Sequence, residues 1–192
     1  MLKKMRWRFS LTAAVWITFW LYFDHNGDAV YSICGAAFHE CGHLLLLFAL
    51  HDAPQRITFG IFGIALDRAR PMRLGYIQEL AVYTAGPAAN LLLALALLPL
   101  PRLRRAVRVN LLLAGFNLLP IPPLDGSGIL YAALCLRTSP VRAAALRKKI
   151  AACGVLPLAV IVVWDFWHGR HNYSLLLSVV YVLSLFLPST SM

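Results

Sequence analysis

Long apolar runs dominate this 192-residue chain and are the strongest constraint on what it can fold into. Several of them approach the ~20 residues that a helix needs to cross the hydrocarbon core of a bilayer. Hydrophobic residues make up 60% of the chain, and its mean hydropathy is +0.69. Because the runs and their short connections use nearly the whole length, we expect one membrane-embedded domain over residues 1–192.

The pattern predicts an all-α polytopic membrane protein with about six transmembrane helices. The fourth is expected to be interrupted, because a regular helix cannot continue through Pro120, Pro122 and Pro123. A glycine-rich segment near residues 55–70 is too short to span. It fits a short β-hairpin or extended segment, and it fits an amphipathic loop on the membrane surface equally well. The predicted spans are 10–23, 29–50, 76–100, 107–136, 150–167 and 173–187.

Basic residues cluster at the ends of the apolar runs. The formal net charge of +10 could indicate a nucleic-acid partner, but this distribution favours topology signals and contacts with lipid headgroups, so we expect no nucleic acid. With six crossings and a cytoplasmic amino terminus, 5 of the 18 Lys and Arg fall on the far side and the rest on the cytoplasmic side. The balance predicts a cytoplasmic amino terminus, although the cluster from Arg102 to Arg108 lies on the wrong side.

His39, Glu40 and His43 form an H-E-x-x-H pattern inside the run 29–50. Histidines four apart project from one helix face with Cβ atoms ~5–6 Å apart, which suits two ligands of one Zn²⁺, and the glutamate between them can act as general base. Ionisable groups at bilayer depth are costly, roughly 2.5–3.5 kcal/mol for Asp, Lys or Arg, and usually mark function. With His43 seven residues before Leu50, the predicted zinc site lies on the order of 10 Å below the cytoplasmic boundary.

Catalytic zinc sites normally take three protein ligands, so a further donor is expected. Of the acidic residues, only Glu40 and Asp125 fall outside loops and predicted helix ends. Asp125 follows the proline-broken stretch and precedes Gly126, so its carboxylate can be aimed into the helix bundle. An isolated aspartate there would usually be a turn or capping residue. Beside a buried H-E-x-x-H pattern, Asp125 is the predicted third ligand.

Together these motifs resemble the site-2 protease family of intramembrane zinc metalloproteases. The resemblance rests on F-H-E-C-G-H at 38–43, A-G-P-A-A-N at 85–90, and the F-N-L-L-P to L-D-G stretch at 116–126, which follow in the family's order. The motifs and hydropathy cover roughly residues 29–131. The compact layout is most similar to the sporulation-type branch with six spans, and no PDZ or CBS domain is expected.

The resemblance implies a metalloendopeptidase of a bacterial cell membrane, acting within or near transmembrane segments of membrane-spanning protein substrates, with a regulatory partner protein conceivable. It implies one Zn²⁺ per chain, held by His39, His43 and Asp125, and Glu40 as the base.

Two asparagines belong to the resembling segments. Asn117 is suggested to position substrate or stabilise the oxyanion, while a bond to a neighbouring helix explains it equally well. Asn90 is expected to support helix packing rather than catalysis.

A different class of function is a catalytically inactive zinc-binding membrane scaffold or transporter. A transporter is expected to spread polar groups across both halves of the bilayer, whereas this chain concentrates them at one depth. An inactive homologue is expected to lack the base or a ligand, and all four of these residues are present. The sequence therefore favours the enzyme.

Overall fold

The computed structural model describes residues 6–9, 18, 21–22, 24, 27–52, 54, 56–60, 63–67 and 74–169. The chain divides into two compact units, Met1–Asn117 and Leu118–Met192. A single peptidase domain made of both units stays a prediction.

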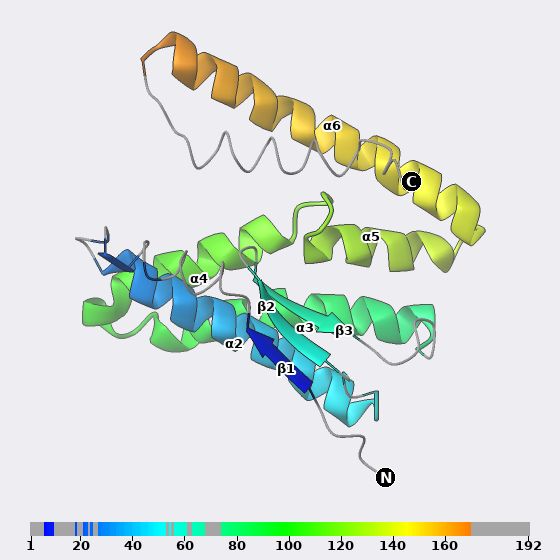
Figure 1. Cartoon of the computed structure of the whole chain (residues 1–192), viewed down its shortest axis with the longest axis horizontal. Coiled ribbons are helices and arrows are strands. Elements are labelled where there is room, and N and C mark those ends of the chain that lie inside the picture. The colour runs from blue at the N-terminus through cyan, green and yellow to red at the C-terminus, as the bar shows by residue number, and fades with distance from the viewer. Residues whose placement is uncertain are drawn as a thin grey trace. The chain divides into compact units, whose positions relative to one another are not determined.

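Three helices of the first unit pack against one another: α2 (Asp28–Ala49), α3 (Tyr76–Leu97) and α4 (Arg104–Asn117) (Figure 1). A short 3-10 turn, η1 (Pro101–Leu103), leads into α4. Every fourth residue is buried from Gly35 to Leu47 on α2 and from Val82 to Ala94 on α3. Such narrow stripes that include small residues let helix backbones approach closely, which is how helices associate in membranes.

The start of α2 is fixed by the carboxylate of Asp24. Its two oxygens accept hydrogen bonds from the backbone N–H groups of Asp28 (3.2 Å) and Ala29 (2.7 Å). These bonds satisfy two of the four amide groups that a helix leaves unpaired at its start. Gly27, immediately before the helix, has a φ of 77°, a left-handed conformation that glycine adopts without strain.

A three-stranded sheet also belongs to the first unit, with the order β1 (Arg6–Phe9), β2 (Arg56–Gly60), β3 (Gly63–Asp67). β1 pairs parallel with β2, and β2 pairs antiparallel with β3. The last two strands lie within residues 55–70, the segment for which the sequence allows a hairpin or extended pair. The sequence does not predict β1, because pairing between segments about fifty residues apart leaves no local pattern.

In the second unit, α5 (Asp125–Cys135) packs against α6 (Pro140–Trp167). The predicted interruption is confirmed, since α4 ends at Asn117 and α5 begins at Asp125. The helix α6 begins ten residues before the predicted fifth span, 150–167, and ends with it at Trp167. Proline is well accommodated at the first helical position, and Arg and Lys are good helix formers that hydropathy does not detect.

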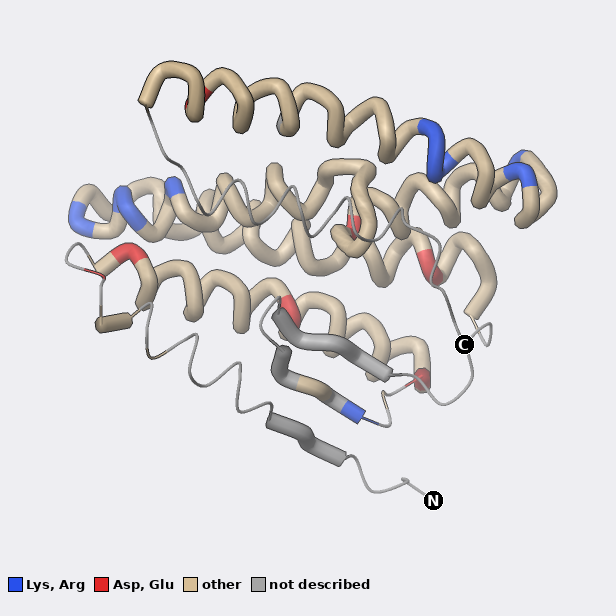
Figure 2. Tube along the Cα trace, turned by 45° about the horizontal axis from the view of Figure 1, so that its top comes forward, with Lys and Arg blue, Asp and Glu red and all other residues tan. Residues whose placement is uncertain are grey.

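Three of the described helices, α2, α3 and α6, are long and apolar enough to cross a membrane. Large apolar side chains on them are exposed, among them Leu45, Leu92 and Val160, as expected where lipid is the solvent. Lys and Arg gather near helix ends (Figure 2). The chain is therefore a mostly helical integral membrane protein. The predicted spans 10–23 and 173–187 fall almost entirely outside the described residues, so the number six and the orientation stay predictions.

Candidate metal centre

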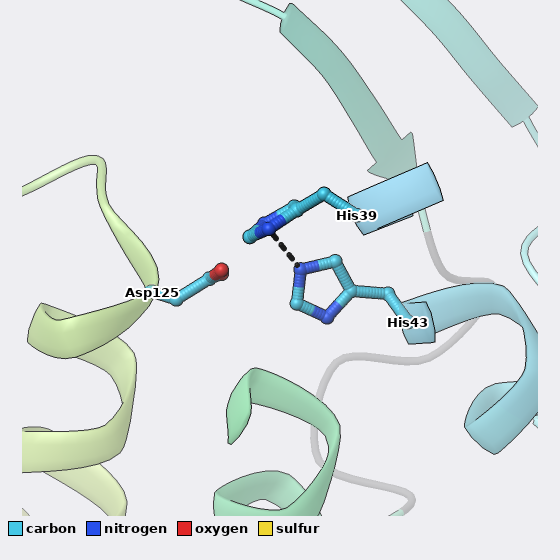
Figure 3. A group of neighbouring side chains, drawn as sticks. All are labelled: His39, His43 and Asp125. Carbon is cyan, nitrogen blue, oxygen red and sulfur yellow. Dashed lines mark hydrogen bonds between the residues drawn. The ribbon is translucent and has the colours of Figure 1, made fainter. Parts of the chain in front are cut away.

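His39 and His43 face the same point from the buried side of α2, where they are 6% and 7% exposed. Their Nε2 atoms lie 3.2 Å apart, and their rings are inclined at 80° (Figure 3). Two imidazole nitrogens bound at about 2.0–2.1 Å to one tetrahedral Zn²⁺ would lie roughly 3.3 Å apart. The pair therefore fits a shared ion, as the spacing predicts.

The backbone of α3 fixes the orientation of the His43 ring. Its Nδ1 donates a 2.7 Å hydrogen bond to the carbonyl of Val82. Because a carbonyl only accepts, Nδ1 carries the hydrogen and Nε2 keeps the lone pair that a metal needs. A partner on the second nitrogen is typical of metal-binding histidines. The sequence could not indicate Val82, since a backbone carbonyl has no residue signature.

Gly86 closes the site on the α3 side. A Cβ atom at this position would overlap Nε2 of His43 and lie 2.6 Å from Nε2 of His39. No side chain can therefore replace the glycine without displacing the imidazoles. Gly86 belongs to the A-G-P-A-A-N segment at 85–90, one of the segments on which the family resemblance rests. In the structure, Gly86 packs directly against the imidazoles of His39 and His43.

The close approach of α2 and α3 depends on Gly42, which lies next to His43. A Cβ atom there would lie 2.5 Å from the carbonyl oxygen of Ala85 and 2.9 Å from the Cβ of Ala89. The small residues on both helices thus set the distance at which the Val82 carbonyl reaches His43. Asn90 is fully buried on the same face of α3, and its packing role stays a prediction.

Glu40 lies on α2 between the two histidines and is half-buried. One residue past His39 is about 100° around the helix, so Glu40 stands at the margin of the buried stripe. The role of Glu40 as the base stays a prediction.

Asp125 belongs to the second unit, where it is half-buried and is the first residue of α5. The loop before it folds tightly over the first turn, because a Cβ atom on Gly126 would overlap the carbonyl of Leu118 and lie 2.5 Å from that of Leu119. The N–H of Ser127 donates to the carbonyl of Leu124 at 3.0 Å. The position of Asp125 is thus fixed within its unit, at a helix start whose dipole favours a carboxylate.

Asn117 is the last residue of α4 and is half-buried. Its Nδ2 donates a 3.0 Å hydrogen bond to the carbonyl of Leu113 in its own helix. This bond is neither of the two roles that the sequence suggests, and a catalytic role for Asn117 stays a prediction.

Paired imidazoles on a helix of membrane-spanning length define this chain as a membrane protein with a candidate metal centre. Its structure is similar to a solved structure, the Site-2 Protease from Methanocaldococcus jannaschii, with a TM-score of 0.67 and 20% sequence identity, over 95% of this chain and 90% of that one. The chain therefore has the site-2 protease fold, and the resemblance that the sequence predicts is confirmed. The sporulation-type branch stays a prediction.

A sequence relative comes from Synechocystis sp., where it is named "Putative zinc metalloprotease". The two are 37% identical over an alignment of 103 positions, which covers 48% of this chain and 27% of the relative. The alignment thus spans about a quarter of that relative's length. No protein-family model matches the chain.

Proposed function

We propose that this protein is a zinc metalloendopeptidase that hydrolyses peptide bonds within or near transmembrane segments of membrane proteins. The observation that carries the proposal is the 3.2 Å separation of two Nε2 atoms, from His39 and His43, on a helix apolar enough to cross a bilayer. The fold of a solved site-2 protease and the similarity to a relative named as a zinc metalloprotease support the same activity.

The third zinc ligand in this proposal is Asp125. Two imidazoles and a carboxylate are a donor set that catalytic zinc sites use, with a fourth position open. In this proposal one ion would bind one ligand atom from each of His39, His43 and Asp125. The proposal therefore requires both units to contribute ligands to the same ion.

Zinc bound in this site would polarise the scissile carbonyl and make a water molecule more acidic. Glu40 would take a proton from the attacking water and deliver it to the leaving amine. The Val82 carbonyl holds the ring of His43 in the tautomer that presents Nε2. Gly86 keeps the space in front of both imidazoles clear of side chains.

The proposed substrate is a single-span membrane protein. Its helix must unwind before a peptide bond can be attacked, which releases backbone groups that lipid cannot satisfy. Addition of the unwound segment as a strand to an outer edge of the sheet would pair those groups again. In the described sheet β1 and β3 are the outer strands. A regulatory partner protein would control whether the substrate reaches this edge of the sheet.

The proposal is tested by co-expression with a panel of single-span substrates and by counting bound zinc. We expect wild type to bind zinc and cleave, Glu40→Gln to bind zinc without cleaving, and Asp125→Ala to lose zinc. The matched control is Glu79→Gln, which changes the other glutamate of the chain and should leave cleavage intact.

Two results would count against this assignment. Cleavage by zinc-loaded Glu40→Gln would remove Glu40 from the mechanism. A zinc-loaded wild type that cleaves no member of the panel would favour an inactive zinc-binding scaffold or transporter.

A further inference from the structure

A basic cavity lies at the start of α2, separate from the histidine pair. It has a volume of about 690 Å³, and its lining includes Gly27, Tyr31 and four arginines, Arg102, Arg104, Arg105 and Arg108. Tyr31 precedes His39 by eight residues, or about 12 Å along the helix. All the described residues that line it belong to the first unit. The volume lies within the range of about 300–1,000 Å³ that is usual for small-molecule sites.

The described residues that line this cavity include four arginines and no acidic residue. The nearest acidic residues in sequence are Asp24 and Asp28 at the start of α2, and the Asp24 carboxylate accepts two backbone hydrogen bonds there. The described lining is therefore strongly basic.

Three of these arginines, Arg104, Arg105 and Arg108, lie in α4, and their position there further favours an anion. α4 begins at Arg104, and its first turn contains no acidic residue. A helix start carries a partial positive charge, so cations there are unfavourable and an anion is favoured. An anion in the cavity would relieve both the mutual repulsion of the guanidinium groups and their conflict with the helix dipole.

The predicted membrane topology does not account for these four residues. In the predicted six-span orientation, the far side holds Arg102, Arg104, Arg105 and Arg108 together with Arg170 only, so this cluster is the reverse of what the positive-inside rule requires. Binding of an anion would explain why these arginines lie there.

We propose that this cavity binds a phosphate-bearing anion. Guanidinium groups match phosphate oxygens with paired hydrogen bonds, and basic pockets between membrane helices commonly hold lipid headgroups. Exposed apolar side chains adjoin the cavity, with Val30 in its wall and Leu100 next to Pro101 of its lining. A phospholipid headgroup and inorganic phosphate are two sources of the same chemistry. The proposal is independent of the protease activity.

The experiment uses the full chain, purified in detergent, and measures binding by native mass spectrometry and calorimetry. The probes are phosphatidylglycerol, phosphatidylcholine and inorganic phosphate. The test variant combines Arg104→Gln, Arg105→Gln and Arg108→Gln. The matched control combines Arg142→Gln, Lys148→Gln and Lys149→Gln, which removes the same charge from exposed positions of α6.

We expect phosphatidylglycerol to bind wild type and the control equally and the test variant about 10- to 100-fold more weakly. Phosphatidylglycerol binding without phosphate binding identifies a lipid site, and binding of both identifies the phosphate group itself as the determinant. Equal binding by wild type and the test variant, or phosphatidylcholine binding as tight as phosphatidylglycerol binding, would overturn the proposal. If the triple variant fails to fold, the three single variants are measured instead. Wild-type binding of phosphatidylglycerol by all three single variants would also overturn the proposal.

Discussion

The Nδ1 atom of His43 donates a 2.7 Å hydrogen bond to the backbone carbonyl of Val82, which links the metal-facing ring on α2 to the main chain of α3. The orientation of the metal-facing Nε2 therefore depends on the distance between α2 and α3 as well as on His43 itself. Changes that move α3 relative to α2 should disturb metal binding without removing any ligand.

Replacement of His43 by asparagine should weaken zinc binding at least about 100-fold, since it removes a ligand together with its bond to Val82. Zinc per chain, measured by mass spectrometry of the purified protein after dialysis, checks this. The control is His51→Asn. His51 is exposed at the end of α2 and has a φ of 56°, a conformation that asparagine tolerates. Equal zinc in both variants would exclude His43 as a ligand.

Replacement of Gly86 by alanine should reduce zinc affinity about 10- to 100-fold, because the added methyl group displaces both imidazoles. Isothermal titration with zinc of the metal-free protein measures the change. Gly115→Ala in α4 is the control, since a Cβ atom there meets no atom within 4 Å and alanine favours a helix. Wild-type affinity in the Gly86 variant would mean that the two helices lie further apart than described.

Replacement of Gly42 by alanine should destabilise the protein by about 1–3 kcal/mol, because the methyl group meets the Ala85 carbonyl, which is backbone and cannot turn aside. Thermal unfolding of the metal-free protein in detergent checks this, again with Gly115→Ala beside it. Metal-free conditions separate the packing effect from any loss of zinc. An unchanged unfolding temperature would contradict the close contact of α2 with α3 at this point.

The sequence predicts what depends on local spacing. Histidines four residues apart must share a helix face, and prolines at 120, 122 and 123 must break a helix, so the paired imidazoles and the gap between α4 and α5 could both be foreseen. The long apolar runs likewise indicate α2 and α3 to within a few residues.

What the sequence could not predict depends on contacts between distant segments. The bond from His43 to Val82 and the place of Gly86 against the imidazoles arise only when α2 meets α3. The pairing of β1 with β2 is of the same kind. The arginines from 102 to 108 appear in the sequence only as a misplaced charge cluster, and the cavity that they line needs α2 as its other wall.

The most direct test of the central claim is a crystal structure of the zinc-loaded protein with anomalous scattering recorded at the zinc edge. The account predicts one anomalous peak per chain, bound by Nε2 of His39, Nε2 of His43 and a carboxylate oxygen of Asp125 at about 2.0–2.2 Å. A zinc ion that lacks Asp125 among its ligands, or that binds only one of the two imidazoles, would contradict it.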